Sequence, residues 1–260
     1  MEIKAFKMDG LGNDFVIIDQ RNKDFILSND QITKICDRKF IGCDQLILIK
    51  KNKKVDAGLE FYNSDGSVSG ACGNGTRCIA DLLAKENNKK EINLWTSGGI
   101  LKSKILENNL VETEIGIPNT NWDKIPLSKN QNTKNLNIKI LDKNNKEYTG
   151  GTAVNVGNPH VVFFVDNIED YDLKTLGPKI ENHKLFPNKC NVTLAKVVNS
   201  NLIKVRVWER GAGLTKACGT AACATAVAAN INELTEKKVD IEFSLGNLSI
   251  LIDTNNSIHM

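Results

Sequence analysis

Two cysteines, Cys72 and Cys218, each stand directly before a glycine and a helix-like run, in "CGNGTRCIADLLA" and "CGTAACATAVAANI". No histidine lies near Cys72 in the sequence to act as its base. A helix N-terminus carries about half a positive charge and free N–H groups, so it binds carboxylates and lowers the pKa of a neighbouring thiol from about 8.5 into a range of about 3.5 to 7.5. We therefore expect the helix, rather than a histidine, to activate each thiol.

A pair of such thiols suits the inversion of a carbon atom that carries a carboxylate. The N–H groups of Gly73-Asn74 and of Gly219-Thr220 would hold the carboxylate, where charge accumulates during the reaction. One cysteine, as thiolate, removes the α-hydrogen, and the other, as thiol, returns a proton from the opposite face. The two sulfurs should titrate as a coupled pair. Which cysteine serves which stereoisomer is left open, because the two roles are exchangeable.

An internal repeat supports two matching halves. "GNDFVIID" from Gly12 is echoed by "GNPHVVFFVD" from Gly157, "FIGCDQLILI" by "FPNKCNVTLA", the Cys72-Gly73 pair by Cys218-Gly219, and "TSGGI" by "SLGNL". The spacings are 145 to 147 residues and the order is the same throughout. Repeats of this kind indicate repeated structural units. We expect two similar domains related by a pseudo-twofold axis, residues 1–117 carrying Cys72 and residues 118–260 carrying Cys218, with the active site in the cleft between them.

Polar residues occupy equivalent places in the two halves without being identical. Asn13 matches Asn158, Gln45 matches Asn191, and Asn63 matches Glu209. A symmetric frame that carries different polar groups predicts an asymmetric, zwitterionic ligand.

The hydrophobic pattern predicts a β-rich α/β fold. Strands are expected over residues 15–19, 45–50, 102–106, 161–165 and 202–207, and helices over residues 28–37, 76–86 and 220–230. The last helix is small and apolar on every side, which is typical of a helix enclosed by other structure. Residues 128–146, rich in lysine and asparagine, resemble exposed loops and hairpin turns.

Composition excludes several classes of protein. The chain has 260 residues, 41% of them hydrophobic, and a net charge of +3, so it can form a large core. The lysine-rich run at residues 50–54 has no interleaved aromatic residues and is interpreted as a solvated turn, not a nucleic-acid patch. No signal peptide or membrane segment is apparent, and the seven cysteines form an odd, irregular set. We expect a cytoplasmic protein with reduced thiols, and core positions for Cys36, Cys43, Cys78, Cys190 and Cys223.

The motifs together resemble the diaminopimelate epimerase family nearly end to end. The resemblance rests on "GLGNDFVIID", "DQLILI", "NSDG", "CGNGTRC", "GNPH", "FPNKCNV" and "WERGAGLTKACGTAACA". It implies two pseudo-symmetric α/β domains, each a β-barrel-like mixed sheet around a central apolar helix. It also implies cofactor-independent epimerisation of LL-2,6-diaminopimelate to meso-diaminopimelate, with no metal, a small-molecule substrate, and neither nucleic acid nor membrane as a partner.

The same resemblance assigns the site residues. It makes Cys72 and Cys218 the catalytic pair and gives His160 and Glu209 the role of tuning the two thiols. The implied substrate-binding residues are Asn13, Gln45, Asn63, Gly73, Asn74, Asn158, Asn191, Glu209, Arg210, Gly219 and Thr220. Arg210 would hold the distal carboxylate bidentately.

The chain departs from the family pattern in two places. Leu214 stands where the family usually has glutamate, and we expect little effect on the chemistry. The sequence ends at "SIHM", where family members continue with a Thr-Gly-Pro-Ala segment and a tail that carries an aromatic residue at the dimer contact. A homodimer is implied by the family, and dimerisation and domain closure should suffer if that tail is absent.

Other functions fit the residues less well. A thiol–disulfide oxidoreductase would also use two activated cysteines, but neither half has C-x-x-C and redox chemistry does not explain the matched polar residues. A non-enzymatic amino-acid-binding protein would not need two thiols, and the cysteine spacings do not match zinc pairs. Pyridoxal phosphate is not expected, because the sequence shows no clear pattern of a lysine with a phosphate-binding loop. A proline or hydroxyproline racemase-type enzyme uses the same thiols but has no partner for Arg210.

Overall fold

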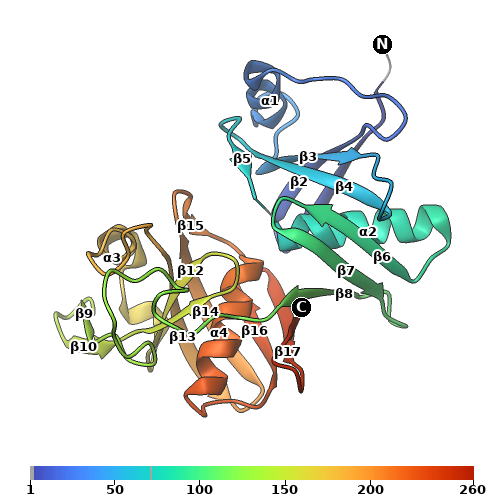
Figure 1. Cartoon of the computed structure of the whole chain (residues 1–260). Helices are drawn as coiled ribbons and strands as arrows, with labels where there is room; N and C mark the ends of the chain where they lie inside the picture. Colours follow the sequence, from blue (N-terminus) through green and yellow to red (C-terminus); the bar gives the residue numbers. More distant parts are fainter. Residues whose placement is uncertain (1–2, 71) are drawn as a thin grey trace. The chain divides into compact units, whose positions relative to one another are not determined.

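The computed structural model describes residues 3–70 and 72–260. The chain divides into two compact units, Met1–Glu114 and Ile115–Met260. Each unit is a mixed sheet with a long helix against it (Figure 1). The division falls inside strand β8, slightly before the position expected from the sequence.

The described part of the N-terminal unit contains eight strands and two helices. Their bounds are β1 (Ala5–Gly10), β2 (Asn13–Asp19), α1 (Asn29–Cys36), β3 (Gln45–Lys50), β4 (Ala57–Asn63), β5 (Val68–Ser69), α2 (Gly73–Asn87), β6 (Glu91–Thr96), β7 (Gly99–Ile105) and β8 (Val111–Gly116). Strands β2 and β3 are parallel, as are β4 and β6, and the other neighbouring pairs are antiparallel.

Helix α2 forms the centre of this unit. Its buried face, which includes Ile79 and Leu83, shares a core cluster with Phe15, Ile47 and other residues of β2, β3, β4 and β6. Gly75 in the first turn allows the close approach, because a Cβ there would lie 2.5 Å from Ile47 Cδ1. The start of α2, and Cys72 with it, is therefore held tightly against the sheet.

The C-terminal unit repeats this plan. Its elements are β9 (Ile138–Leu141), β10 (Glu147–Gly150), β11 (Thr152–Asn155), β12 (Pro159–Phe164), the 3-10 turn η1 (Ile168–Asp170), α3 (Leu173–Glu181), β13 (Asn191–Asn199), β14 (Leu202–Glu209), β15 (Gly213–Thr215), α4 (Gly219–Ile231), β16 (Lys238–Phe243), β17 (Gly246–Ile252) and β18 (Ile258–His259). Strands β12 and β13 are parallel, as are β14 and β16, which are the counterparts of the two parallel pairs in the first unit.

The pairing of strands is repeated residue by residue in the two units. Leu46 pairs with Tyr62 and Val192 with Trp208, each position shifted by 146 residues. Phe61 pairs with Ser69 and Val207 with Thr215, again shifted by 146. The internal repeat seen in the sequence therefore corresponds to a repeated fold.

Helix α4 confirms the expectation of an enclosed apolar helix. Nearly all of its residues are buried, including the polar Thr225 and every alanine from Ala221 to Ala229. It packs on β11, β12, β13, β16 and β17 of its own unit. Small side chains on all faces permit this, since sheet lies close on more than one side.

Several predicted elements are confirmed with shifted ends. Helix α1 begins after Ser28, whose side chain and that of Gln31 form a reciprocal cap, and it ends before Asp37. Helix α2 begins three residues earlier than predicted, at Gly73. Residues 128–146 contain the predicted hairpin turn between β9 and β10, but Leu136, Ile138 and Ile140 are buried in the core.

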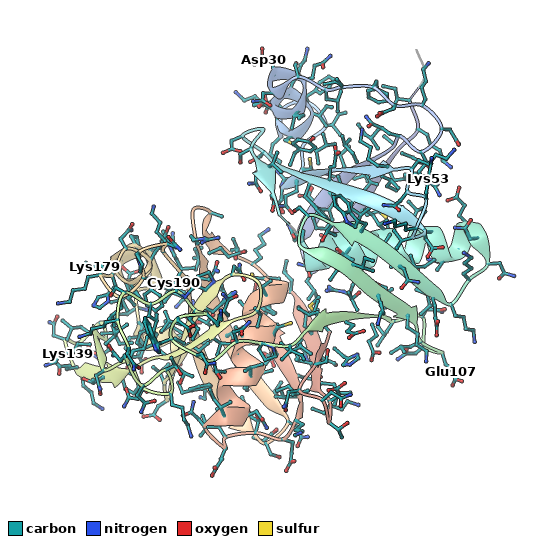
Figure 2. All side chains as sticks on the ribbon, in the orientation of Figure 1. Asp30, Lys53, Glu107, Lys139, Lys179 and Cys190 are labelled. Carbon is teal, nitrogen blue, oxygen red and sulfur yellow. The ribbon has the colours of Figure 1, made fainter. Side chains whose placement is uncertain are left out.

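The surface carries the charged residues, as the composition suggested. The labelled side chains Lys53, Lys139 and Lys179 lie at the periphery, whereas Cys190 lies inside the C-terminal unit (Figure 2). The described cysteines are all free thiols, and the five that we assigned to the core are buried. Across residues 3–70 and 72–260, no helix has the length and apolar character required to cross a membrane.

Candidate active site

Cys72 is the residue that caps the N-terminus of α2. Its backbone is extended, with φ −143° and ψ 110°, and its carbonyl accepts the first helical hydrogen bond from Thr76 N at 2.8 Å. Its Sγ accepts from Gly75 N–H at 3.5 Å. The thiol thus lies at the positive end of the helix, as the sequence predicted.

One asparagine contacts this sulfur, and a second asparagine contacts the first. Asn13, at the start of β2, accepts with Oδ1 from the Cys72 thiol at 3.7 Å and from Asn74 Nδ2 at 3.4 Å. Asn74 is buried, and its Oδ1 accepts from Arg77 Nη2 at 2.9 Å. The structure therefore brings Asn13 and Asn74 together with Cys72.

Gln45 and Asn63 form a second polar pair at the ends of neighbouring strands. They stand opposite each other on β3 and β4, and Gln45 Nε2 donates to Asn63 Oδ1 at 3.0 Å. Asn63 in turn donates to Ser67 Oγ at 3.0 Å. Their partly exposed side chains leave polar atoms available to a ligand.

Cys218 occupies the same position on α4. Its φ of −145° and ψ of 117° match those of Cys72. The Cys218 thiol donates to Glu209 Oε2 at 3.0 Å and lies 3.4 Å from Thr220 Oγ. Glu209 ends β14 and directly precedes the turn that leads back to α4 through β15.

The expected lowering of the thiol pKa is wrong for Cys218. Burial raises the pKa of Cys218 well above its usual value, and the Glu209 carboxylate adds to the rise. The Thr220 hydroxyl and the Ala221 N–H act in the predicted downward direction but are outweighed. Desolvation disfavours a thiolate more than the helix end favours it, so Cys218 is a protonated thiol in this structure.

His160 lies within the C-terminal unit, fully buried on β12. Its Nε2 is 2.8 Å from Asn158 Oδ1 and 3.4 Å from Asn191 Nδ2. Burial lowers the pKa of His160 to about 3, and Arg210 adds to the effect, so the ring is neutral. Within the described residues Nδ1 has no hydrogen-bond partner, which favours the tautomer with its proton on Nε2, since a buried N–H without an acceptor is costly.

Neutral burial of His160 predicts a pH-dependent stability. The unfolded histidine, with a pKa of about 6.5, binds a proton before the folded one does. The free energy of unfolding should therefore decrease as pH falls from about 6.5 toward 3, by about 1.4 kcal/mol per pH unit. His160→Phe, which introduces the residue found at the matching Phe15, removes this contribution. Between pH 7 and pH 5 the free energy of unfolding, measured with urea, should decrease by about 2 kcal/mol more in the wild type than in the variant. Equal decreases in the two proteins would contradict the assignment.

Asn191, the first residue of β13, and Arg210, directly after β14, lie next to each other in the C-terminal unit. Asn191 is buried, donates to Pro159 O at 3.0 Å and accepts from Arg210 N–H at 3.0 Å. The Arg210 guanidinium is exposed and donates to Asn188 O at 3.0 Å. Its remaining N–H groups can still receive a carboxylate.

The predicted site residues thus form two clusters, one in each unit. The N-terminal cluster comprises Asn13, Gln45, Asn63, Cys72, Gly73 and Asn74, and the C-terminal cluster comprises Asn158, His160, Asn191, Glu209, Arg210, Cys218, Gly219 and Thr220. The sequence reasoning missed Asp44, whose Oδ2 accepts from Asn13 Nδ2 at 3.1 Å. Its position directly before Gln45 was the available signal. Within residues 3–70 and 72–260, no group of three His, Cys, Asp or Glu side chains is arranged to hold a metal ion.

Each cluster combines a thiol with groups that suit acid–base chemistry. In the N-terminal cluster a partly exposed sulfur accepts a helix N–H, and its thiol form donates to the Asn13 carbonyl oxygen. In the C-terminal cluster a buried thiol contacts a carboxylate that can take its proton.

Comparison with known sequences identifies relatives along the whole chain. The diaminopimelate epimerase family model matches residues 5–120 and 152–260. The chain is 75% identical over 260 residues to a diaminopimelate epimerase of Pelagibacter ubique, covering 100% of this chain and 95% of that protein. It is 40% identical over 245 residues to that of Acidiphilium cryptum, covering 94% and 87%.

Solved structures share the fold. A PhzF-family phenazine biosynthesis protein of Bacillus anthracis has a TM-score of 0.66 at 14% identity, covering 99% of this chain and 92% of that one. A hydroxyproline epimerase of Agrobacterium vitis has a TM-score of 0.62 at 11% identity, covering 99% and 89%. These likenesses confirm the predicted mixed α/β fold with few helices.

Proposed function

Since this chain belongs to the diaminopimelate epimerase family, whose members are isomerases, we propose that it interconverts LL-2,6-diaminopimelate and meso-diaminopimelate with Cys72 and Cys218 as its two proton carriers. One observation supports this most directly. The two cysteines occupy the same N-cap position, with matching backbone angles, on equivalent helices of two repeated units. A reaction that needs one base and one acid on opposite faces of a carbon requires such a pair.

The two sulfurs differ in their protonation state at the start of the reaction. Cys218 is the proton donor, because burial and Glu209 raise its pKa. Cys72 is the base, because it is less buried and accepts the Gly75 N–H. After one turnover the protonation states of the two sulfurs are exchanged, so Cys218 is then the thiolate and can act as the base of the reverse reaction. When the reverse reaction starts instead from the enzyme with protonated Cys218, that proton passes to Glu209 and Cys72 takes a proton from solvent.

The helix ends supply the stabilisation of charge. The reacting carboxylate binds to the N–H groups of Gly73 and Asn74 and of Gly219 and Thr220, which point along the helix axes. Negative charge that spreads onto the carboxylate when the α-hydrogen leaves is stabilised there without a cofactor. Arg210 binds the distal carboxylate. Gln45, Asn63 and Asn191 line the path of the substrate's carbon chain between its two carboxylates. We place the reaction in the cytoplasm, where free thiols persist.

Hydrogen exchange tests the two-carrier mechanism directly. LL-diaminopimelate is turned over in deuterated water, and the reaction is stopped at low conversion. We expect deuterium at one α-carbon of the meso product and almost none in the recovered LL isomer, because the proton removed by one sulfur is not the proton returned by the other. Early labelling of the LL isomer would mean a single exchanging base and would reject the proposed pair.

A further inference from the structure

We propose that Asp44 is a positioning residue that fixes the side-chain amide of Asn13 with its carbonyl oxygen toward Cys72. This deepens the proposed function, since it assigns a role in the same site to a residue outside the predicted set. The hydrogen-bond partners of Asn13 require this orientation, and the equivalent Asn158 has the opposite one.

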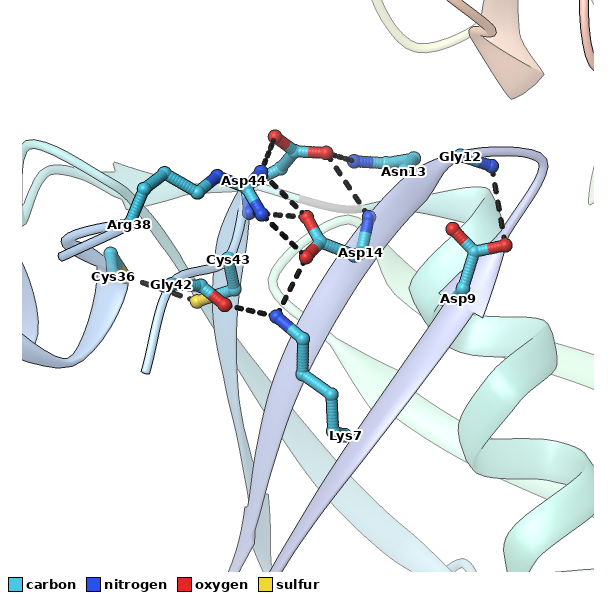
Figure 3. Close-up of polar contacts among 10 residues, drawn as sticks. All are labelled: Lys7, Asp9, Gly12, Asn13, Asp14, Cys36, Arg38, Gly42, Cys43 and Asp44. Atoms are coloured by element: carbon cyan, nitrogen blue, oxygen red, sulfur yellow. Dashed lines mark hydrogen bonds and ion pairs between the residues drawn. The ribbon is translucent and has the colours of Figure 1, made fainter. Parts of the chain in front are cut away.

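The orientation of the Asn13 amide follows from the chemistry of its neighbours. A carboxylate can only accept hydrogen bonds, so the side chain of Asn13 must present Nδ2 to Asp44 Oδ2, 3.1 Å away. Oδ1 then points to the Cys72 thiol at 3.7 Å and to Asn74 Nδ2 at 3.4 Å. Figure 3 shows the Asn13 amide nitrogen directed at Asp44.

Asp44 is itself fixed from two sides. Its Oδ2 also accepts from Asp14 N–H at 3.1 Å, and its Oδ1 accepts from Arg38 Nη2 at 2.6 Å (Figure 3). Arg38 is held in turn by two hydrogen bonds to Asp14, of 2.6 and 2.7 Å. The carboxylate therefore has little freedom to turn away from Asn13.

The C-terminal unit orients its matching asparagine the other way. At the position of Asp44 it has Cys190, a buried thiol that donates to Ile180 O and offers no carboxylate. His160 stands where the first unit has Phe15, and its Nε2–H faces Asn158 Oδ1 at 2.8 Å. Asn158 consequently directs Nδ2 toward Thr220 Oγ at 3.5 Å. The helix start at Asn74 faces a carbonyl oxygen, whereas the helix start at Thr220 faces an N–H donor.

The opposite orientations of the Asn13 and Asn158 amides make the surroundings of the two cysteines chemically different. A carbonyl oxygen beside Cys72 accepts from an ammonium group and from a thiol, and it disfavours the thiolate. Asp44 therefore keeps the thiol form of Cys72 accessible, which the enzyme needs whenever that sulfur returns a proton. Without Asp44, Asn13 could turn Nδ2 toward the sulfur and stabilise the thiolate instead.

The test compares three variants of the full-length protein. Asp44→Ala removes the acceptor. Asp44→Asn keeps an acceptor oxygen for the Asn13 amide and the Asp14 N–H but removes the negative charge. Its amide nitrogen then faces Arg38, which still donates to Asp14. Arg38→Met disturbs the ion cluster and leaves the Asp44 acceptor in place. The side chain of Asp44 is 42% exposed, so its truncation opens no core cavity.

Two quantities are measured for each variant: kcat/KM for epimerisation, and the pH dependence of Cys72 alkylation by iodoacetamide. Trypsin releases Cys72 as the sole cysteine of the peptide spanning residues 55–77, so its modification can be followed by mass spectrometry. Other charged groups here are Arg77, which donates to Asn74, and Asp9 on β1, whose carboxylate accepts from Gly12 N–H, and no variant changes either.

We expect Asp44→Ala to lower kcat/KM about tenfold and to shift the alkylation midpoint of Cys72 down by about one pH unit. Asp44→Asn should stay within about threefold of the wild type with no shift in the midpoint. Arg38→Met should have a smaller effect than Asp44→Ala on both quantities, because Asp14 N–H still holds the Asp44 carboxylate. Equal effects of Asp44→Ala and Asp44→Asn would show that charge, not hydrogen-bond acceptance, matters, and would overturn the proposal, as would an unshifted midpoint in Asp44→Ala. The alkylation result does not depend on turnover, so it remains informative if hydrogen exchange rejects the two-carrier mechanism.

Discussion

Replacing Cys218 by alanine is expected to lower epimerisation by about 10³-fold or more, because one face of the substrate loses its proton carrier. The change removes only the sulfur from a residue at the start of an alanine-rich helix, so the fold should be preserved. Epimerisation is followed by the change of optical activity or by separation of the isomers. The remaining thiol, Cys72, should still remove and return a proton on its own face, giving slow α-hydrogen exchange in one stereoisomer without inversion.

Cys223→Ala provides a matched control for this variant. Cys223 lies inside the helix that Cys218 caps, five residues further on, and is fully buried. The chemical change is identical and the loss of buried volume is similar, but the thiol has no assigned role. We expect its activity to remain within about threefold of the wild type. A Cys218→Ala enzyme that still inverts the α-carbon at a rate close to that of Cys223→Ala would exclude Cys218 as a proton carrier.

The topology of each unit could be predicted because the repeat carries its own register. Once Cys72-Gly73 is aligned with Cys218-Gly219, the strands before and after them align as well, and the pairing of Leu46 with Tyr62 predicts that of Val192 with Trp208. Two copies of one pattern constrain each other, whereas a single short strand pattern is ambiguous.

Helix α3 could not be predicted because its sequence contains two helix breakers. Gly177 and Pro178 interrupt the apolar pattern of "LKTLGPKIE". Packing explains the glycine, since a Cβ on Gly177 would lie 2.3 Å from Trp208 Cγ. A requirement set by a tryptophan on another strand cannot be read from the local sequence.

The electrostatics of the thiols depended on contacts that sequence spacing does not reveal. The helix N-terminus was correctly predicted at Cys218, but the burial of the sulfur and its distance from Glu209 decide the direction of the pKa shift. Asp44 escaped notice for a related reason. It has no carboxylate counterpart in the second half, where Cys190 stands, so the comparison of the two halves did not mark it.

Glu209→Gln is expected to lower kcat/KM by about 100-fold, because the amide cannot take the proton that the Cys218 thiol must lose before it acts as a base. The side chain keeps its size and can still accept the thiol hydrogen bond, so the contact near 3.0 Å can be retained. Loss of the neighbouring negative charge should also lower the pKa of Cys218, although burial will hold that pKa above the usual value. The ultraviolet absorbance of the thiolate, measured against pH, reports this shift.

The loss in Glu209→Gln must be the same in both directions of the reaction, although Glu209 contacts only one of the two thiols. The ratio of kcat/KM for the LL and meso isomers equals the equilibrium constant, which no variant can change. The asymmetry should appear instead in α-hydrogen exchange at early times, where only the step that requires Cys218 as base is slowed. Glu233→Gln, an exposed substitution just beyond the end of α4, serves as the control with unchanged activity. Near-normal kcat/KM in Glu209→Gln, or a Cys218 pKa that rises, would contradict a role for Glu209 in moving the proton.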